Sequence, residues 1–159
     1  MEIVTADLWD KYAQELTLLN VDFRHFGVKT NFAGEVVTLK LYEDNTYVRK
    51  LLAEPGAGKV LVVDGGGSRR CALVGDNIAK LAMDNHWEGI IVYGCIRDSQ
   101  VINDLQVAIK AIGTCPVKSI KRDVGIVGEE LIIAGTKINP GQYVYADMDG
   151  VLLSNQKLV

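Results

Sequence analysis

The fold of this chain is decided by residues 75–98, which read GDNIAKLAMDNHWEGIIVYGCIRD. Apolar residues recur at helical spacing over 76–86, so this part is predicted to form an amphipathic helix. Residues 89–94 are a short, mostly β-branched run bounded by glycines, which predicts a buried strand. A helix that leads directly into a buried strand is typical of an α/β sheet.

The two charged ends of this stretch are predicted to meet at one edge of the sheet. Eleven helical residues rise roughly 16 Å, and six extended residues return about 20 Å. Asp76 begins the helix, and Arg97 and Asp98 follow the strand, so the three side chains should lie close together. In open α/β sheets this edge, outside the carboxyl ends of the strands, is where ligands bind.

The rest of the sequence predicts a single α/β domain over residues 1–159, with mixed helices and strands and a second, β-rich layer. A chain of 159 residues can bury a hydrophobic core and is too short for two comfortable domains. The further helices are predicted over 5–16, 47–53 and 100–112. The further strands are predicted over 36–39, 59–64, 69–74, 125–127, 131–133 and 143–147.

Composition argues against several functional classes. A net charge of −3 gives no basic field for nucleic acid. No apolar run reaches about 18 residues, so no membrane span is expected. The first residues lack a basic region followed by an apolar region, so a signal peptide is not expected. Three cysteines at these spacings fit neither a disulfide framework nor a zinc site, so we expect a reduced, cytoplasmic protein. Only two histidines occur, so any metal should be a hard cation held by carboxylates and water.

The start of the predicted helix, from Gly75 to Ile78, is a candidate anion site. The first backbone N–H groups of a helix have no partner within it and lie at the positive end of its dipole. A substrate carboxylate could therefore bind to the amides of Asn77 and Ile78. The simpler alternative is that Asp76 only caps the helix and that the amides bind water.

Arg97 and Asp98 form the second candidate group, just after the buried strand. A guanidinium at this position could hold a carboxylate or a carbonyl oxygen. A carboxylate could hold Mg²⁺ or Mn²⁺, which favour oxygen ligands and keep several waters. The alternative is a surface ion pair without a chemical role.

Two other features carry weaker signals. Gly65, Gly66 and Gly67 follow a predicted strand, but a nucleotide-binding loop of the form G-x-G-x-x-G is not met. A backbone that passes close to a ligand or a partner subunit is the better interpretation of these glycines. A basic cluster at 118–122 is either a solvated edge or a contact for an acidic ligand.

Four segments together resemble the RraA-like family, which includes the regulator of ribonuclease activity A and the class II 4-hydroxy-4-methyl-2-oxoglutarate aldolases. These segments cover residues 60–68, 72–76, 94–98 and 145–150, and the resemblance extends over essentially the whole chain. Its most specific motif is Asp-x20-Arg-Asp, formed here by Asp76, Arg97 and Asp98. In this family the motif separates the aldolases from the ribonuclease regulators, which typically lack the last aspartate.

The resemblance implies a swivelling β/β/α-like fold with mixed β/β/α layers, and a homotrimer with its sites at the subunit interfaces. It also implies roles for single residues. Asp98 would bind Mg²⁺ or Mn²⁺ directly, and Asp76 would reach the metal through water. Arg97 and the amides of Asn77 and Ile78 would bind the pyruvate half of a small 2-keto acid.

The activity implied by the resemblance is retro-aldol cleavage of 4-hydroxy-4-methyl-2-oxoglutarate, or the related 4-carboxy-4-hydroxy-2-oxoadipate, to pyruvate. A metal-associated water is the expected base, and decarboxylation of oxaloacetate, which forms the same enolate, is an expected side activity. Many aldolase members carry an acid three residues after the last aspartate of the motif, where this chain has Val101.

Two other functions remain open at this point. The first is a regulator that binds and inhibits ribonuclease E by protein contact, in which Asp98 would be idle. The second is a methyltransferase of quinone biosynthesis, a name sometimes attached to this family. The absence of G-x-G-x-x-G counts against the methyltransferase.

Overall fold

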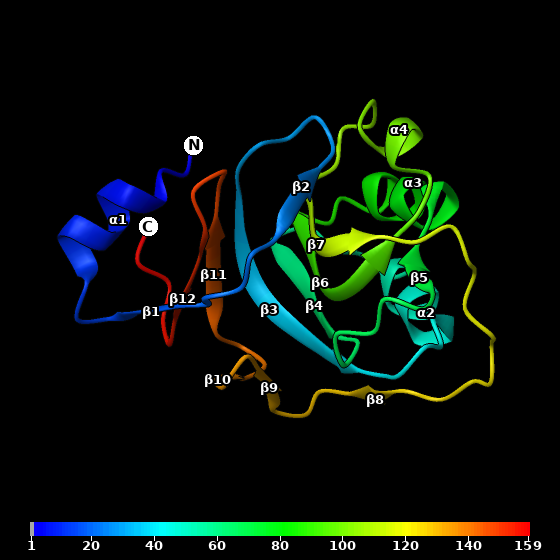
Figure 1. Ribbon diagram of the computed structural model, residues 1–159. Helices are drawn as coiled ribbons and strands as arrows, with labels where there is room; N and C mark the ends of the chain where they lie inside the picture. Colours follow the sequence, from blue (N-terminus) through cyan, green and yellow to red (C-terminus); the bar gives the residue numbers. More distant parts are fainter. Residues whose placement is uncertain (1) are drawn as a thin grey trace.

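The computed structural model describes residues 2–159, and its main element is a ten-stranded sheet (Figure 1). Four parallel strands form the centre of the sheet, in the order β3 (Phe32–Lys40), β4 (Lys59–Asp64), β6 (Gly89–Ile96) and β7 (Ile109–Thr114). The parallel centre makes one edge common to the carboxyl ends of all four strands.

Antiparallel strands flank this centre. Next to β3 the order continues with β11 (Tyr143–Ala146), β12 (Val151–Ser154) and β1 (Leu16–Leu18), and β2 (Arg24–Phe26) pairs with β7 at the other end. Shorter elements complete the set: β5 (Ala72–Val74) beside β6, β8 (Ile126–Val127) beside β3, and a separate hairpin of β9 (Leu131–Ile133) and β10 (Thr136–Ile138).

The helices of residues 2–159 lie on two opposite sides of the molecule (Figure 1). The helices α2 (Thr46–Leu52), α3 (Asp76–Asp84) and α4 (Ser99–Ile102) gather on one side of the central strands, and α1 (Thr5–Tyr12) lies beyond β12. This arrangement confirms the predicted α/β class with a second, β-rich layer. No helix within residues 2–159 is long and apolar enough to cross a bilayer.

The central strands bury both of their faces, as strands of a parallel sheet usually do. In β4, Leu61 and Val63 belong to the core under the helices, whereas Val60 and Val62 belong to the core that faces the β-rich layer. All four side chains are completely buried. Alternation with a period of two thus divides one apolar run between two cores.

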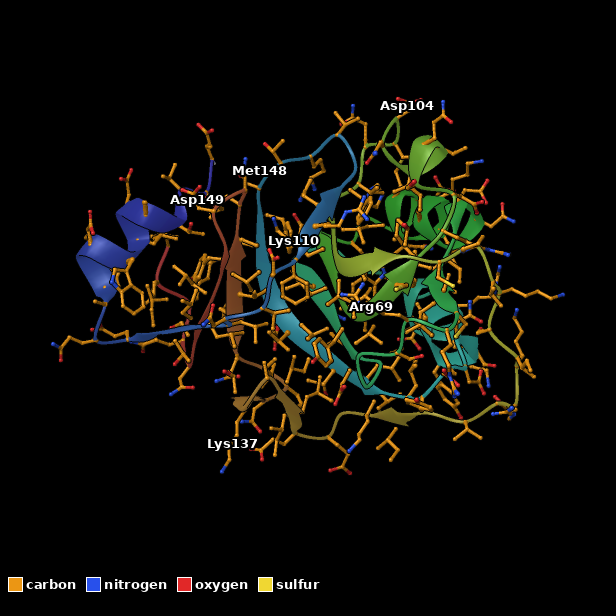
Figure 2. The ribbon with its side chains drawn as sticks, in the orientation of Figure 1. Arg69, Asp104, Lys110, Lys137, Met148 and Asp149 are labelled. Atoms are coloured by element: carbon orange, nitrogen blue, oxygen red, sulfur yellow. The ribbon has the colours of Figure 1, made fainter. Side chains whose placement is uncertain are left out.

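The predicted helix over 100–112 is wrong: α4 ends at Ile102 and β7 begins at Ile109. The apolar residues there do recur at helical spacing, but the run from Ile109 onward pairs in parallel with β6. Ile109 points into the core under the helices, while Lys110 points the other way and donates a hydrogen bond from Nζ to the Asp147 carbonyl (Figure 2). Tertiary pairing therefore overrides the local helical pattern.

The other predicted elements differ from the structure mainly at their ends. The helix predicted over 5–16 ends at Tyr12, and Leu16 begins β1. The helix predicted over 76–86 is confirmed as far as Asp84, and the strand predicted from Gly89 continues two residues further, to Ile96. No strand was predicted at the positions of the short strands β1, β2, β10 and β12.

Candidate active site

The candidate site lies where β5, β6 and the start of α3 converge, at the predicted edge of the sheet. The Arg97 N–H donates to the carbonyl of Val74 at 2.9 Å, and the Cys115 N–H donates to the carbonyl of Ile96 at 2.9 Å. These bonds fix the end of β6 between β5 and the chain that leaves β7. Asp76, Arg97 and Asp98 are brought together as the sequence predicted.

Asp98 turns back toward the start of α3. Its backbone is left-handed, with φ 57° and ψ 36°, a conformation that Asp and Asn adopt more readily than most residues. The Oδ2 atom of Asp98 accepts a hydrogen bond of 3.0 Å from the Asp76 N–H. The Asp98 carboxylate is therefore held at the first amide of α3, which is the backbone N–H of Asp76 itself.

Gly75 makes this close approach possible. A Cβ atom at position 75 would lie 2.9 Å from Oδ2 of Asp98 and 3.5 Å from Nε of Arg97. The backbone of Gly75 itself is extended, so the requirement is one of space and not of a left-handed dihedral. Any larger side chain here would displace the Asp98 carboxylate.

Asp76 bonds to its own helix. Its Oδ1 atom accepts a 2.9 Å hydrogen bond from the Asn77 N–H, and its Oδ2 atom lies 3.6 Å from Nζ of Lys80. The Asn77 amide, a predicted seat for a substrate carboxylate, is thus already engaged. The Ile78 N–H has no acceptor within the part of the chain that the structure describes.

The pKa of Asp76 lies below its ordinary value. Partial desolvation acts to raise it, but the hydrogen bond from the Asn77 N–H and the nearby Lys80 ammonium act to lower it. Asp76 is consequently ionised at neutral pH.

A polar pocket of about 90 Å³ opens beside these residues. Its lining includes all of the predicted site residues, from Gly75 to Ile78 together with Arg97 and Asp98. Lys118 and Lys121 of the predicted basic cluster also line it, which supports contact with an acidic ligand over a merely solvated edge.

Sequence reasoning missed Asn45, Arg49 and Ser119 as lining residues of this pocket. Asn45 and Arg49 come from the region of α2, about thirty residues before the motif. Their spacing of four residues, which puts both on one face of a helix, is the signal that could have found them once α2 was placed over the edge.

A larger hollow of about 920 Å³ lies at the opposite end of the strands, beside Lys59 and Glu88. It contains none of the predicted site residues. Because ligands of parallel sheets bind at the carboxyl ends of the strands, we take the smaller pocket as the candidate site.

Asp76 and Asp98 are the groups that fit a divalent cation. No residue of 2–159 donates a hydrogen bond to Oδ1 of Asp98, which leaves this atom free to bind an ion. The described chain contains no group of three or more His, Cys, Asp or Glu side chains placed to hold a metal. Two carboxylates suit Mg²⁺ or a similar hard cation that keeps most of its waters, and they do not suit a tetrahedral zinc centre.

Comparison with known proteins identifies close relatives over the whole chain. A family model described as RraA-like, Aldolase/RraA, matches residues 5–153. Relatives from Alkalilimnicola ehrlichii and Dechloromonas aromatica are 47% and 48% identical to this chain, and each match covers at least 99% of both sequences. Both relatives carry the provisional name 4-hydroxy-4-methyl-2-oxoglutarate aldolase.

Solved structures give the same fold under two different names. A Geobacillus kaustophilus protein named as an S-adenosylmethionine:2-dimethylmenaquinone methyltransferase superposes with a TM-score of 0.96 at 45% identity, covering 98% of this chain and 97% of its own. The RNA-processing inhibitor RraA of Thermus thermophilis superposes with a TM-score of 0.95 at 42% identity, covering 100% of this chain and 96% of its own. Three activities are therefore named among close relatives of one fold.

Proposed function

Because this chain belongs to the RraA-like family, we propose that it is a divalent-metal-dependent aldolase that releases pyruvate from 4-hydroxy-4-methyl-2-oxoglutarate. The related 4-carboxy-4-hydroxy-2-oxoadipate is a second substrate of the proposal, and oxaloacetate decarboxylation is its side activity. One observation carries the proposal: Asp76, Arg97 and Asp98 meet at a single polar pocket, with Asp98 bonded to the start of α3. The names of the relatives support the substrate.

The residues of the site suit cleavage of a 2-keto acid. The free Ile78 amide and the Arg97 guanidinium can hold the carboxylate and keto oxygens of the pyruvate half. When a base removes the proton from the C4 hydroxyl, the C4–O bond becomes a carbonyl of a second keto acid, the C3–C4 bond breaks, and its electron pair is left in a pyruvate enolate. A proton added at C3 then gives pyruvate. Arg97, fixed at the end of β6, can stabilise the negative charge that develops on the keto oxygen.

Asp98 would hold the cation through its free oxygen, and Asp76 would hold a water in the cation's shell. A bound Mg²⁺ or Mn²⁺ would act as a Lewis acid on the keto acid oxygens. The ionised Asp76 accepts hydrogen bonds only, so it would orient that water by accepting a hydrogen bond from one of its O–H groups.

Removal of divalent metal is expected to abolish pyruvate release. Purified protein with Mg²⁺ should form pyruvate from 4-hydroxy-4-methyl-2-oxoglutarate and from oxaloacetate, EDTA should reduce both rates to the blank, and excess Mg²⁺ or Mn²⁺ should restore them. A lactate dehydrogenase coupled assay measures the rate, and pyruvate added to the EDTA sample checks the coupling enzyme. No rate above the blank with Mg²⁺, or full activity in EDTA, contradicts the proposal.

The alternative function is regulation of a ribonuclease by protein contact, as the name of the Thermus relative describes for that protein. Exposed apolar side chains line the segment that leaves the site, which suits contact with another chain. They are Val117, Ile120, Val124, Ile126, Val127 and Ile132. This alternative needs no Asp98 carboxylate, so the activity of Asp98 variants separates the two functions.

The same exposed side chains suit contact between copies of this chain, and the family resemblance implies that the assembly is a homotrimer. We expect sedimentation equilibrium to give three times the monomer mass of 17.4 kDa. A charged replacement in the centre of the segment, Val124→Asp, should shift the population toward monomer, because it would bury an unpaired carboxylate in the interface. A parent protein that sediments as a monomer would contradict this expectation.

A further inference from the structure

One wall of the pocket carries more positive charge than a pyruvate molecule needs. Four cations line the pocket, namely Arg49, Arg97, Lys118 and Lys121, against the two carboxylates of Asp76 and Asp98. The net charge of the lining side chains is therefore +2 before any metal is bound. A single carboxylate on the ligand neutralises only half of that charge.

Three of these cations have no side-chain partner among residues 2–159, whereas the fourth, Arg97, donates a hydrogen bond to the Pro116 carbonyl. The ion pairs formed within residues 2–159 are Lys50–Asp123, Arg70–Glu43 and Lys80–Asp76. Arg49, Lys118 and Lys121 are absent from them, although the neighbouring Lys50 and Arg70 are paired. Cations that line a pocket without a partner carboxylate are available to an anionic ligand.

The wall is held in place by bonds between its two elements. The Asn45 N–H donates to Oγ of the buried Ser119 at 3.2 Å, and the Asn45 amide group donates to the carbonyl of Leu73 at 3.2 Å. The start of α2 is thus fixed both to the segment that carries Lys118 and Lys121 and to β5. This fixed wall reduces the ordering cost of ligand binding.

Asn45 adds a second sign that this wall faces a ligand. Its Oδ1 atom is buried and receives no hydrogen bond from any residue of the described chain. A buried acceptor without a donor is costly and uncommon. A water or a ligand hydroxyl in the adjacent pocket is the kind of donor it lacks.

We propose that this wall, with Arg49 as its principal residue, binds the distal carboxylate of the substrate and so selects 2-oxo diacids over 2-oxo monoacids. The proposal rests on the proposed aldolase function for its pyruvate end, where Arg97 and the start of α3 act. It adds the recognition of the far end of the molecule, which the Asp-x20-Arg-Asp motif does not explain. Arg49 is suited to the role because its planar guanidinium can bind a carboxylate through two hydrogen bonds.

Binding of two unreactive ligands tests the proposal without catalysis. The ligands 2-oxoglutarate and 2-oxopentanoate share a five-carbon chain and a 2-oxo acid end, and they differ by the distal carboxylate. Isothermal titration calorimetry in Mg²⁺ should show the parent binding 2-oxoglutarate about 10- to 100-fold more tightly. The Arg49→Gln variant should lose most of this preference while it binds 2-oxopentanoate as the parent does.

The matched control is Lys50→Gln, which removes a cation from the next position of the same helix but outside the pocket. It should keep the parent preference. A parent without preference for 2-oxoglutarate, or an Arg49→Gln variant that keeps the preference, overturns the proposal. Loss of folding in either variant would appear as a lowered melting temperature, in which case Arg49→Lys, which retains the charge without the two-bond geometry, is expected to restore part of the preference.

Kinetics separate this proposal from the aldolase function itself. If the parent cleaves 4-hydroxy-4-methyl-2-oxoglutarate, Arg49→Gln should lower kcat/KM for that diacid about 10- to 100-fold and change that for 4-hydroxy-2-oxopentanoate less than about twofold. Equal losses on both substrates contradict selection by Arg49. Absence of cleavage by the parent contradicts the aldolase function, and the calorimetry still decides whether the wall recognises a distal carboxylate.

Discussion

Replacing Asp98 with asparagine is expected to lower kcat/KM for pyruvate release about 10³-fold, which corresponds to about 4 kcal/mol of transition-state stabilisation. Asparagine has the same shape and also tolerates left-handed backbone, so the turn at φ 57° should persist. Its carbonyl oxygen can still accept the hydrogen bond from the Asp76 N–H. The variant thus removes the negative charge that would hold the cation and leaves the architecture of the site in place.

The measurement is the coupled assay on 4-hydroxy-4-methyl-2-oxoglutarate, with circular dichroism to check the fold. Asp104→Asn is the control, because it removes an exposed carboxylate six residues further on, just beyond α4 and outside the pocket (Figure 2). It should retain the parent rate. An Asp98→Asn variant as active as the parent would remove the basis for the aldolase mechanism and favour a function by protein contact.

The opening helix–strand unit could be placed from sequence because its geometry is local. The length of α3 and the length of β6, which runs back alongside it, nearly match. They place Asp76 and Asp98 close together without reference to distant segments of the chain. The same reasoning predicted which amides are exposed at the start of α3, but it could not predict that Asp76 would occupy the Asn77 N–H with its own carboxylate. That contact depends on a side-chain rotamer, which spacing does not determine.

The elements that the sequence did not reveal depend on contacts between distant segments. The apolar residues of 109–112 fit the helical pattern of the preceding residues, but pairing with β6 makes them a strand. Arg49 reaches the pocket because Asn45 is bonded to Ser119 and Leu73, which are 74 and 28 residues away. The sequence of α2 does not indicate those partners. The position of Arg49 beside Lys118 and Lys121 could therefore be found only from the structure.

Asp44 is the residue where a conservative replacement should cost the most stability. Its buried carboxylate accepts four hydrogen bonds: Oδ1 accepts from the N–H and the hydroxyl of Thr46, and Oδ2 accepts from the N–H groups of Arg122 and Val124. It therefore fixes the start of α2 to the segment that carries Lys118 and Lys121. The free energy of unfolding depends on both oxygens, because each of them accepts two donors.

The Asp44→Asn variant is expected to lose about 2–3 kcal/mol of the free energy of unfolding. One of its two ends must present an NH₂ group to donors, which leaves at least one backbone N–H unsatisfied. The melting temperature should fall by roughly 5–10 °C for a chain of this length. Asp123→Asn is the control, since Asp123 is exposed on the same segment and pairs only with Lys50; its effect should stay within about 1 kcal/mol.

The difference between parent and Asp44→Asn should also depend on pH, because hydrogen bonds from Thr46, Arg122 and Val124 outweigh desolvation and lower the pKa of Asp44 to about 2. The unfolded chain has a value near 3.9 for this group, so the folded state favours the ionised form by roughly 2–3 kcal/mol. That stabilisation is complete above the unfolded pKa and is lost as the pH falls through the folded pKa. Urea unfolding at pH 7 and at pH 3 should therefore show a difference in unfolding free energy between parent and variant that becomes smaller in acid. A difference of equal size at both pH values would mean that packing, and not the charge of Asp44, holds the segment with Lys118 and Lys121 to the start of α2.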